Sequence, residues 1–393
     1  MAAALRDTRR GRYVTVAAGG ERVRAFVPPP LPPVPPIRMA GLLTLLEEAN
    51  RAVGRLDGVT SVLPDPPLFL YMYVRKEALL SSQIEGTRSS LSDLLLFEND
   101  EAPGAPLDDV QEVSNYVAAM AHGLDRLRNG FPLSLRLIRE IHQVLLAKGR
   151  GSDQEPGEFR RSQNWVGGTR PGNALYVPPP PNLIIDCMGD LETFLHSKLP
   201  DMPLLIKAGV VHLQFESIHP FLDGNGRLGR LLITFLLCAQ GALREPTLYL
   251  SLYFKTHRRL YYDLLQQVRE EGSWETWLEF FLTGVKETSE QAAATARRIL
   301  ALFDEDRVRI ETLGRKTASA LRLHQRLQAR PITSVRAAAR QLGVSQPTVS
   351  KSIEKLMGLG IVREITGRQR DRVYAYERYL AILNEGTEPL PRE

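Results

Sequence analysis

The stretch HLQFESIHPFLDGNGRLGRLLITFLLCAQG, residues 212–241, contains two apolar segments joined by a glycine-rich loop. The first segment predicts a helix that ends at Ile218, and the second predicts a helix that begins near Gly226. Gly224 and Gly226 allow the backbone to approach a ligand closely, and the first turn of a helix presents N–H groups and a positive dipole end to an anion. The stretch therefore predicts a phosphate site between two buried helices.

Charged side chains gather around this loop. Arg227 and Arg230 lie three positions apart on one helical turn, so both guanidinium groups face one side and can bind phosphate oxygens. Asp223 is a carboxylate within an anion site, which is expected if it binds a Mg²⁺ ion that bridges phosphates. His219 stands at the edge of the loop, where a neutral imidazole can accept the proton of an attacking hydroxyl. A capped loop with surface ion pairs is the alternative, but these groups together favour a site for phosphoryl-type transfer.

The run HPFLDGNGRLGR, from His219 to Arg230, resembles the signature H-P-F-x-[D/E]-G-N-[G/K]-R-x-x-R of the Fic family at every position. The resemblance implies a protein adenylyltransferase, which moves AMP from ATP to a Tyr, Thr or Ser hydroxyl of a target protein with the help of Mg²⁺. It implies His219 as the general base, Asp223 as the Mg²⁺ ligand and Phe221 as a core anchor. The implied phosphate contacts are Gly224, Asn225 and Gly226 as a backbone nest, Arg227 on the inner phosphates and Arg230 on the γ-phosphate.

A second pattern lies upstream, in the sequence SSQIEG. Its residues Ser81, Glu85 and Gly86 resemble the inhibitory pattern [S/T]-x-x-x-E-[G/N] of the same family. A carboxylate presented to Arg230 would satisfy the guanidinium and take the place of the γ-phosphate. The resemblance therefore implies autoinhibition by Glu85. The alternative is an ordinary acidic helix end, where a negative charge opposes the helix dipole.

Most of the remaining chain has apolar residues at helical spacing, with Gly, Pro or Ser at the segment ends, which predicts a mainly α helical bundle. Between two such segments lies a Gly- and Pro-rich stretch, residues 155–181, which we interpret as a β-hairpin flap. Within it, QNWVGG (163–168) and ALYVPPPP (174–181) resemble the family's segment that covers the nucleotide and aligns the target chain, and a purely structural hairpin is the alternative. The expected docking residues are Leu175, Tyr176, Val177 and Pro178.

Two further segments invite an interpretation. Residues 260–282 resemble the helix pair that closes the family's adenine pocket, with Tyr261 or, preferably, Tyr262 as the ring contact. Aromatic residues that only fill the core are the alternative. The run PPPLPPVPP, residues 28–36, predicts extended polyproline II that lies as a strap over the following helices or, alternatively, serves as a ligand for an SH3-like domain.

The C-terminal part has a separate character. Ala339, Gly343 and Val349 have the spacing of a helix-turn-helix whose recognition helix covers residues 346–357, and residues 362–376 predict two strands around a basic turn, hence a winged variant. Residues 331–380 contain nine Lys or Arg against four acids, an excess equal to the net charge of +5 of the whole chain. DNA is therefore a candidate partner, with a dimer or partner-binding module as the alternative. The candidate DNA contacts are Gln346, Thr348, Ser350, Lys351, Arg368, Arg370 and Arg372.

These patterns divide the 393 residues into four parts. We expect an N-terminal helical segment with the inhibitory pattern (1–105), a Fic core (106–285), a connecting helix (286–328) and the winged helix-turn-helix domain (329–385). Cys187 and Cys238 lie far apart without metal-ligand spacing, which argues against disulfides or zinc and fits a cytoplasmic protein. Residues 1–24 are too charged for a signal peptide, and no run of about 18 apolar residues predicts a membrane helix.

Three other functions are compatible with the sequence. The core could sense a nucleotide for a DNA-binding regulator, although His219 argues against this function because sensing requires no base. Glu85 could instead orient a water molecule, and the enzyme would then remove AMP from its target. The donor could also be a nucleotide other than ATP, since nothing in the glycine-rich loop recognises the base.

Overall fold

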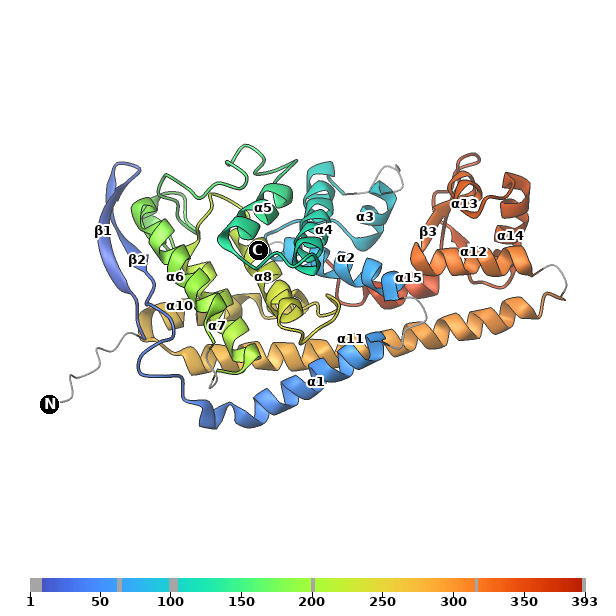
Figure 1. The fold of residues 1–393 in the computed structure, drawn as a ribbon. Coiled ribbons are helices and arrows are strands. Elements are labelled where there is room, and N and C mark those ends of the chain that lie inside the picture. Colours follow the sequence, from blue (N-terminus) through green and yellow to red (C-terminus); the bar gives the residue numbers. More distant parts are fainter. Residues whose placement is uncertain (1–8, 62–65, 99–104, 199–201, 315–316, 391–393) are drawn as a thin grey trace.

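Helices form nearly all the regular structure of the protein, as predicted (Figure 1). The computed structural model describes residues 9–61, 66–98, 105–198, 202–314 and 317–390, so the first eight residues of the stretch considered for a signal peptide lie outside the described part. The α-helices are α1 (Leu43–Ser61), α2 (Pro66–Ile84), α3 (Leu91–Phe97), α4 (Leu107–Arg128), α5 (Leu135–Leu145), α6 (Ile184–His196), α7 (Leu204–Ile218), α8 (Asn225–Ala239), α9 (Ser251–Thr256), α10 (Arg258–Glu271), α11 (Trp274–Glu311), α12 (Ala318–Ala329), α13 (Val335–Leu342), α14 (Gln346–Gly358) and α15 (Glu377–Asn384). The strands are β1 (Arg12–Ala18), β2 (Glu21–Val27), β3 (Ile332–Ser334), β4 (Arg363–Glu364) and β5 (Val373–Ala375), and short 3-10 helices cover Met39–Gly41, Pro171–Asn173 and Pro181–Leu183.

Helix α11 is the longest element, and it runs along one side of the molecule with α1 packed against it (Figure 1). Helices α2, α4, α5, α7 and α8 form the body above it. Helices α12 to α14 follow the C-terminal end of α11 and pack with a three-stranded antiparallel sheet in the order β3-β5-β4. The last helix, α15, then leads the chain back toward the middle of the molecule.

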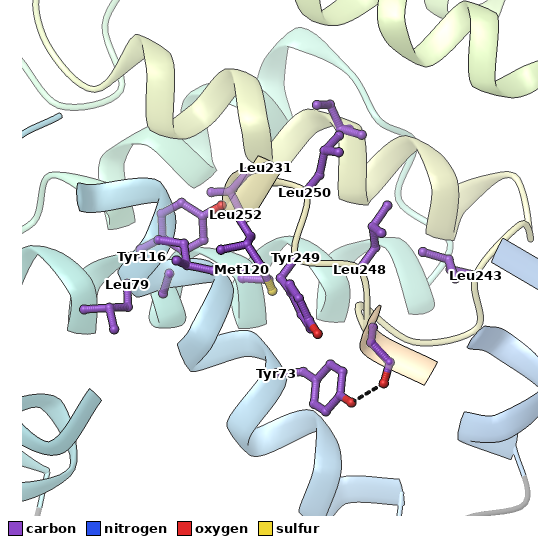
Figure 2. Close-up of a cluster of buried hydrophobic side chains, with 14 of the residues drawn as sticks. Tyr73, Leu79, Tyr116, Met120, Leu231, Leu243, Leu248, Tyr249, Leu250 and Leu252 are labelled. Atoms are coloured by element: carbon purple, nitrogen blue, oxygen red, sulfur yellow. Dashed lines mark hydrogen bonds between the residues drawn. The ribbon is translucent and has the colours of Figure 1, made fainter. Parts of the chain in front are cut away.

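The core lies around α7 and α8, and both helices are buried on almost every face. Figure 2 shows how α2, α4 and α8 meet through Leu79, Tyr116, Met120 and Leu231. Full burial of a leucine of this kind stabilises the fold by roughly 1.5–3 kcal/mol. Gly123 permits the close approach of α4 and α8, because a Cβ at this position would lie 2.4 Å from the Phe235 ring. The two helices that bracket the glycine-rich loop are therefore held on a rigid frame.

A two-stranded hairpin, β1–β2, was not among the predicted elements. Val16 pairs with Val23 in its antiparallel register, and the turn consists of Gly19 and Gly20, which both have positive φ. Two β-prone runs around a Gly-Gly pair are a recognised hairpin signal. The predicted flap, in contrast, contains one bridged pair, Val166 and Tyr176, because its many Gly and Pro residues prevent longer strand pairing.

The strap and the domain limits also differ in detail from the predictions. The proline run lies against α7, where the Gln214 side chain donates to the Pro29 carbonyl at 2.8 Å, but cis peptide bonds at Pro32 and Pro35 interrupt regular polyproline II. Helix α11 continues without a break across residues 285 and 286, where the core was expected to end.

No helix in the described ranges is both long and apolar enough to cross a membrane. Cys187 and Cys238 are both free thiols.

Candidate active site

The glycine-rich loop has a fixed shape set by its own side chains. Helix α7 ends at Ile218, and His219 takes the left-handed conformation (φ 49°, ψ 60°) directly after it. Gly224, with φ 76°, precedes the first residue of α8, Asn225. The Asn225 side chain accepts from the Phe221 N–H and donates to the Phe221 carbonyl, both at 2.9 Å. The buried Asn225 side chain therefore closes the loop, while its backbone stays at the start of α8.

His142 on α5 contacts the same loop at Phe221 and Asp223. This residue was not singled out from the sequence. Its ring stacks on the predicted anchor Phe221, with 3.7 Å between the ring centres. Its Nδ1 accepts from the Gly157 N–H at 2.8 Å, and its Nε2 lies 3.0 Å from the Asp223 carbonyl oxygen, to which it donates. Burial lowers the pKa of His142 to about 4, so the neutral ring keeps this pattern at neutral pH. A histidine inside an apolar helical segment gives no local signal of such a contact.

His219 lies half-buried at the edge of the loop, and Arg160 fixes its backbone. The Arg160 guanidinium donates to the His219 carbonyl at 2.9 Å and to the Pro179 carbonyl at 2.6 Å. Burial, together with the cations Arg160 and Arg269, lowers the pKa of His219 to about 3, so its imidazole is neutral and able to accept a proton. Arg160 was missed because its side chain acts on backbone atoms from a distant loop, which leaves no motif.

The two predicted phosphate-binding arginines are both buried but have different partners. Arg227 donates to Glu112 of α4 at 3.0 Å and lies 3.7 Å from Asp223. Arg230 donates to the Ser81 hydroxyl at 2.8 Å, to the Ser81 carbonyl at 3.0 Å and to Glu85 at 2.6 Å. The structure therefore brings the two sequence patterns, 81–86 and 219–230, together at one point.

The Glu85 carboxylate lies directly over the first turn of α8. A Cβ placed on Gly226 would be only 2.3 Å from Glu85 Oε1. Although burial alone would raise the pKa of Glu85, the nearby Arg230 holds it below its ordinary value, so the group is an anion. The first turn of a helix attracts anions, and here the anion is a side chain of the same protein.

Asp223 is the only predicted metal ligand. Its side chain is 38% exposed, and its Oδ1 accepts from the Gly224 N–H at 2.6 Å. Within the described ranges, no three His, Cys, Asp or Glu side chains are grouped so that they could hold a metal ion by themselves. One exposed carboxylate beside an anion site fits a Mg²⁺ ion whose other ligands are phosphate oxygens and water.

The predicted flap and adenine contacts are only partly accessible. Leu175 is 80% exposed, whereas Tyr176 is buried and donates its hydroxyl to the Ser217 carbonyl. The Val177 carbonyl accepts from the Phe26 N–H at 2.8 Å, so β2 already occupies this edge of the flap. Pro178 is buried as well.

On α10, Tyr261 is a core residue and Tyr262 lies nearer the site. The Tyr261 hydroxyl is 2.9 Å from His212 Nε2, and its side chain is fully buried. Tyr262 is half-buried, and Glu85 and Arg230 are both close enough to act on its phenol electrostatically. This arrangement favours Tyr262 over Tyr261 as the ring beside a bound nucleotide.

The predicted DNA contacts lie on α14 and on the turn between β4 and β5. Gln346, Lys351 and the arginines of the turn are exposed, while Thr348 and Ser350 are half-buried. The Thr348 hydroxyl lies 2.9 Å from that of Ser345 at the start of α14. A hollow of about 870 Å³ opens between α13, the start of α14 and this turn, and Arg336, Arg340 and Arg372 are among its lining residues.

The geometry defines a helical domain in which a carboxylate lies over a helix N-terminus, beside a neutral histidine. Residues 43–125 match the family described as Fic/DOC family N-terminal, and residues 132–237 match the Fic/DOC family. The first match contains Glu85, and the second contains the complete glycine-rich loop. Over these residues the chain belongs to the Fic/DOC family.

Known proteins of this family resemble the chain in sequence and fold. The chain is 36% identical over 202 residues to the protein adenylyltransferase Fic of Aedes aegypti, an alignment that covers 50% of this chain and 37% of that protein. It is 30% identical over 208 residues to the protein of the same name from Drosophila ananassae, covering 52% and 39%. The chain thus spans less than two fifths of the length of these relatives. A Fic family protein from Desulfovibrio desulfuricans G20, known from a crystal structure, has the same fold with a TM-score of 0.57 at 19% identity, over 87% of this chain and 97% of that one.

Proposed function

We propose that the protein transfers AMP from ATP to a Tyr, Thr or Ser hydroxyl of a target protein, and that Glu85 inhibits this reaction. The observation that carries the proposal is the 2.6 Å ion pair between Glu85 and Arg230 at the start of α8. A carboxylate held at a helix N-terminus by a buried arginine marks a binding site for an anionic group. The relatives named protein adenylyltransferase support a nucleotide phosphate as that group.

In this reaction His219 accepts the proton of the target hydroxyl. The hydroxyl oxygen forms a bond to the α-phosphorus, and the bond between this phosphorus and the oxygen bridging to the β-phosphorus breaks, so pyrophosphate leaves with the bonding electrons. Arg227, Arg230 and the first-turn N–H groups of α8 stabilise the negative charge that spreads over the phosphate oxygens. The low pKa of His219 keeps its ring free of a proton before the step.

Asp223 is the residue that would hold Mg²⁺. The ion would neutralise charge on the phosphates, as in other phosphoryl-transfer sites. The Asp223 carboxylate lies 3.7 Å from the Arg227 guanidinium and is partly exposed, so an ion from solvent can reach it.

Glu85 inhibits the transfer by occupying the place of the terminal phosphate. Two negative groups cannot share Arg230 and the space above Gly226, so a bound triphosphate must be displaced from its reactive position. Ser81 reinforces the inhibition, because its hydroxyl and carbonyl hold the same guanidinium toward α2.

The test compares the wild-type protein with the Glu85→Gly and His219→Ala variants. Each is incubated with Mg²⁺ and α-labelled ATP in the presence of cell lysate, and the adduct is identified by intact mass. We expect strong labelling with Glu85→Gly, weak labelling with the wild type and none with His219→Ala. If none of the three labels any protein with ATP, a repeat with other nucleoside triphosphates decides whether the donor or the whole enzyme assignment fails. Loss of AMP from labelled protein on addition of the wild type alone would instead favour the reverse reaction.

Leu175 is the part of the flap best placed to contact a target chain. It protrudes from the bridged pair Val166–Tyr176, and an extended peptide can align along such a segment by backbone pairing. We expect Leu175→Asp to weaken labelling of targets, while AMP transfer onto the enzyme itself is retained. Equal losses of both reactions would show that the flap serves the fold rather than target choice.

The basic hollow beside α14 favours DNA binding as a second function of the same chain. Arg336, Arg340 and Arg372 line it without a compensating number of acids, since Asp371 is the one acidic residue among the described lining residues. Phosphate contacts by such cations depend strongly on salt. An Arg336→Ala, Arg340→Ala, Arg372→Ala triple variant should lose a gel shift of duplex DNA that the wild type gives at low salt. The absence of any wild-type shift at low salt would exclude this function.

A further inference from the structure

The C-terminal tail, residues 385–390, leaves the end of α15 and returns to the inhibitory helix α2. Lys76 on α2 donates to the Glu385 carbonyl at 2.8 Å, and Gln83 on α2 donates to the Thr387 carbonyl at 2.8 Å. Both side chains are almost completely buried.

The tail is also fixed to two other helices. Lys255 on α9 donates to the Gly386 carbonyl at 3.2 Å and to the Glu388 carbonyl. Arg298 on α11 binds the Glu385 carboxylate through two hydrogen bonds of 2.7 and 2.6 Å. The tail therefore connects α2 to α9 and α11.

The contacts on α2 lie close to the inhibitory residue. Lys76 and Gln83 are seven positions apart, so they occupy the same face of α2, and Gln83 precedes Glu85 by two residues. Ser81 and Glu85, which bind Arg230, are four positions apart and share another face. One side of the last turns of α2 thus contacts the tail while the other contacts the catalytic arginine. Leu390 and Gly86, the residue after Glu85, line the same surface hollow.

We propose that the C-terminal tail is a latch that holds the end of α2 in place and so keeps Glu85 on Arg230. If the tail moved away, the buried ammonium groups of Lys76 and Lys255 would have to find new partners, and Gln83 would keep only its bond to the Ser89 carbonyl at 3.1 Å. Leaving a buried donor unpaired is costly. Because the tail follows α15 directly, the latch also joins the C-terminal region to the catalytic site. A displacement of α15 would release the end of α2.

Burial lowers the pKa values of Lys76 and Lys255 to about 8. Both ammonium groups therefore rely on the tail carbonyls for the hydrogen bonds that water would otherwise supply. The tail thus supplies hydrogen bonds that these two buried side chains need, which supports the latch.

The first experiment uses hydrogen–deuterium exchange and does not depend on catalysis. The full-length protein is compared with a chain that ends at Asn384 and with Gly386→Val. Gly386 has φ 78°, a backbone conformation that valine rarely adopts, and a Cβ there would lie 2.9 Å from the Leu252 side chain, so valine should disturb the docking of the tail without shortening the chain. Gly367→Val in the turn between β4 and β5 is the matched control, because Gly367 also has a positive φ, 64°, but among the described residues none beyond its chain neighbours has an atom within 4 Å of the position its Cβ would take.

We expect amide exchange over residues 77–86 to be at least about fivefold faster in the shortened chain and in Gly386→Val, and unchanged in Gly367→Val. If exchange is faster in every helix of the shortened chain, that chain has lost its fold, and the test of the latch then rests on Gly386→Val alone. Unchanged exchange over residues 77–86 in Gly386→Val would overturn the latch.

The second readout, the rate of AMP transfer, rests on the proposed function. Removal of the tail should raise the rate at least about fivefold in the wild-type chain and leave the rate of a Glu85→Gly chain unchanged, because the latch acts through Glu85. An active Glu85→Gly chain together with an unaffected shortened wild type contradicts the latch. A Glu85→Gly chain without activity contradicts the proposed function instead, and hydrogen exchange then still decides on the latch.

Discussion

Glu85 and Arg230 are 145 positions apart in the chain, yet their side chains meet at 2.6 Å above the first turn of α8. Arg230 is buried, whereas about a third of the Glu85 side chain remains exposed. The arginine also keeps both contacts with Ser81. Because Ser81 and Glu85 both lie at the end of α2, Arg230 ties α8 to α2 through two residues, and the partly exposed Glu85 carboxylate is the part of this contact that solvent reaches.

The first prediction concerns the stability that this pair provides. Glu85→Gln keeps the size of the side chain but removes the charge that balances Arg230, so we expect the free energy of unfolding to fall by roughly 1–2 kcal/mol, less than for a completely buried pair. Urea denaturation measures this change. Addition of ATP should stabilise the variant more than the wild type, because the phosphates take over the role of the carboxylate. An equal effect of ATP on both proteins would contradict competition between Glu85 and ATP.

The second prediction concerns His219 and pH. The pKa of His219 is lowered to about 3, so its ring stays unprotonated when the pH falls from 8 to 5. In the active Glu85→Gly chain, the rate of AMP transfer should therefore show no decline with a midpoint near pH 6.5, the ordinary value for histidine. His219→Ala should lower the rate by about 10²–10⁴-fold at every pH. A midpoint near 6.5 in the Glu85→Gly chain would mean that the His219 ring is not held in the neutral form.

The third prediction uses His212, a buried histidine of the core. Burial lowers its pKa to about 3, and its Nδ1 donates to the Gly229 carbonyl at 3.0 Å. Between about pH 3 and 6.5 the unfolded chain binds a proton at this residue and the folded chain does not, so the free energy of unfolding decreases as the pH falls through this range, by at most about 1.4 kcal/mol per pH unit. His212→Asn should reduce this slope in denaturation curves at pH 7.5, 6 and 5. The same slope in both proteins would show that His212 is already protonated in the folded state.

The shape of the glycine-rich loop could be predicted from the sequence, because the residues that determine it lie close together in the chain. The ends of the helices around the loop fall within one residue of the prediction, because Gly224 and the left-handed His219 impose the break locally. The pairing of Glu85 with Arg230 was expected from two separate patterns and agrees with the structure.

The supporting residues could not be predicted in the same way. His142 and Arg160 act on the loop through backbone atoms, and any residue supplies a carbonyl, so no pattern of side chains reveals the contact. The path of the C-terminal tail depends on how α11 and α15 pack, which local propensities do not determine. Contacts between a side chain and backbone atoms far away in the sequence could therefore be found only in the structure.

The last prediction separates Arg160 from its neighbour. Arg160 is buried and donates to the carbonyls of His219, Ser162 and Pro179, so it fixes both the proposed general base and the end of the flap. Arg161 is exposed and provides a matched control with the same chemistry. In the Glu85→Gly chain, Arg160→Ala should lower the maximal rate of AMP transfer at least about tenfold, because misplacement of a catalytic base by a fraction of an ångström is costly. Arg161→Ala should leave the rate within about twofold. Arg160→Lys restores a charge but not the fork of donors, so it should recover little of the rate. Full recovery by lysine would show that Arg160 acts through its charge on the substrate, and not by holding His219.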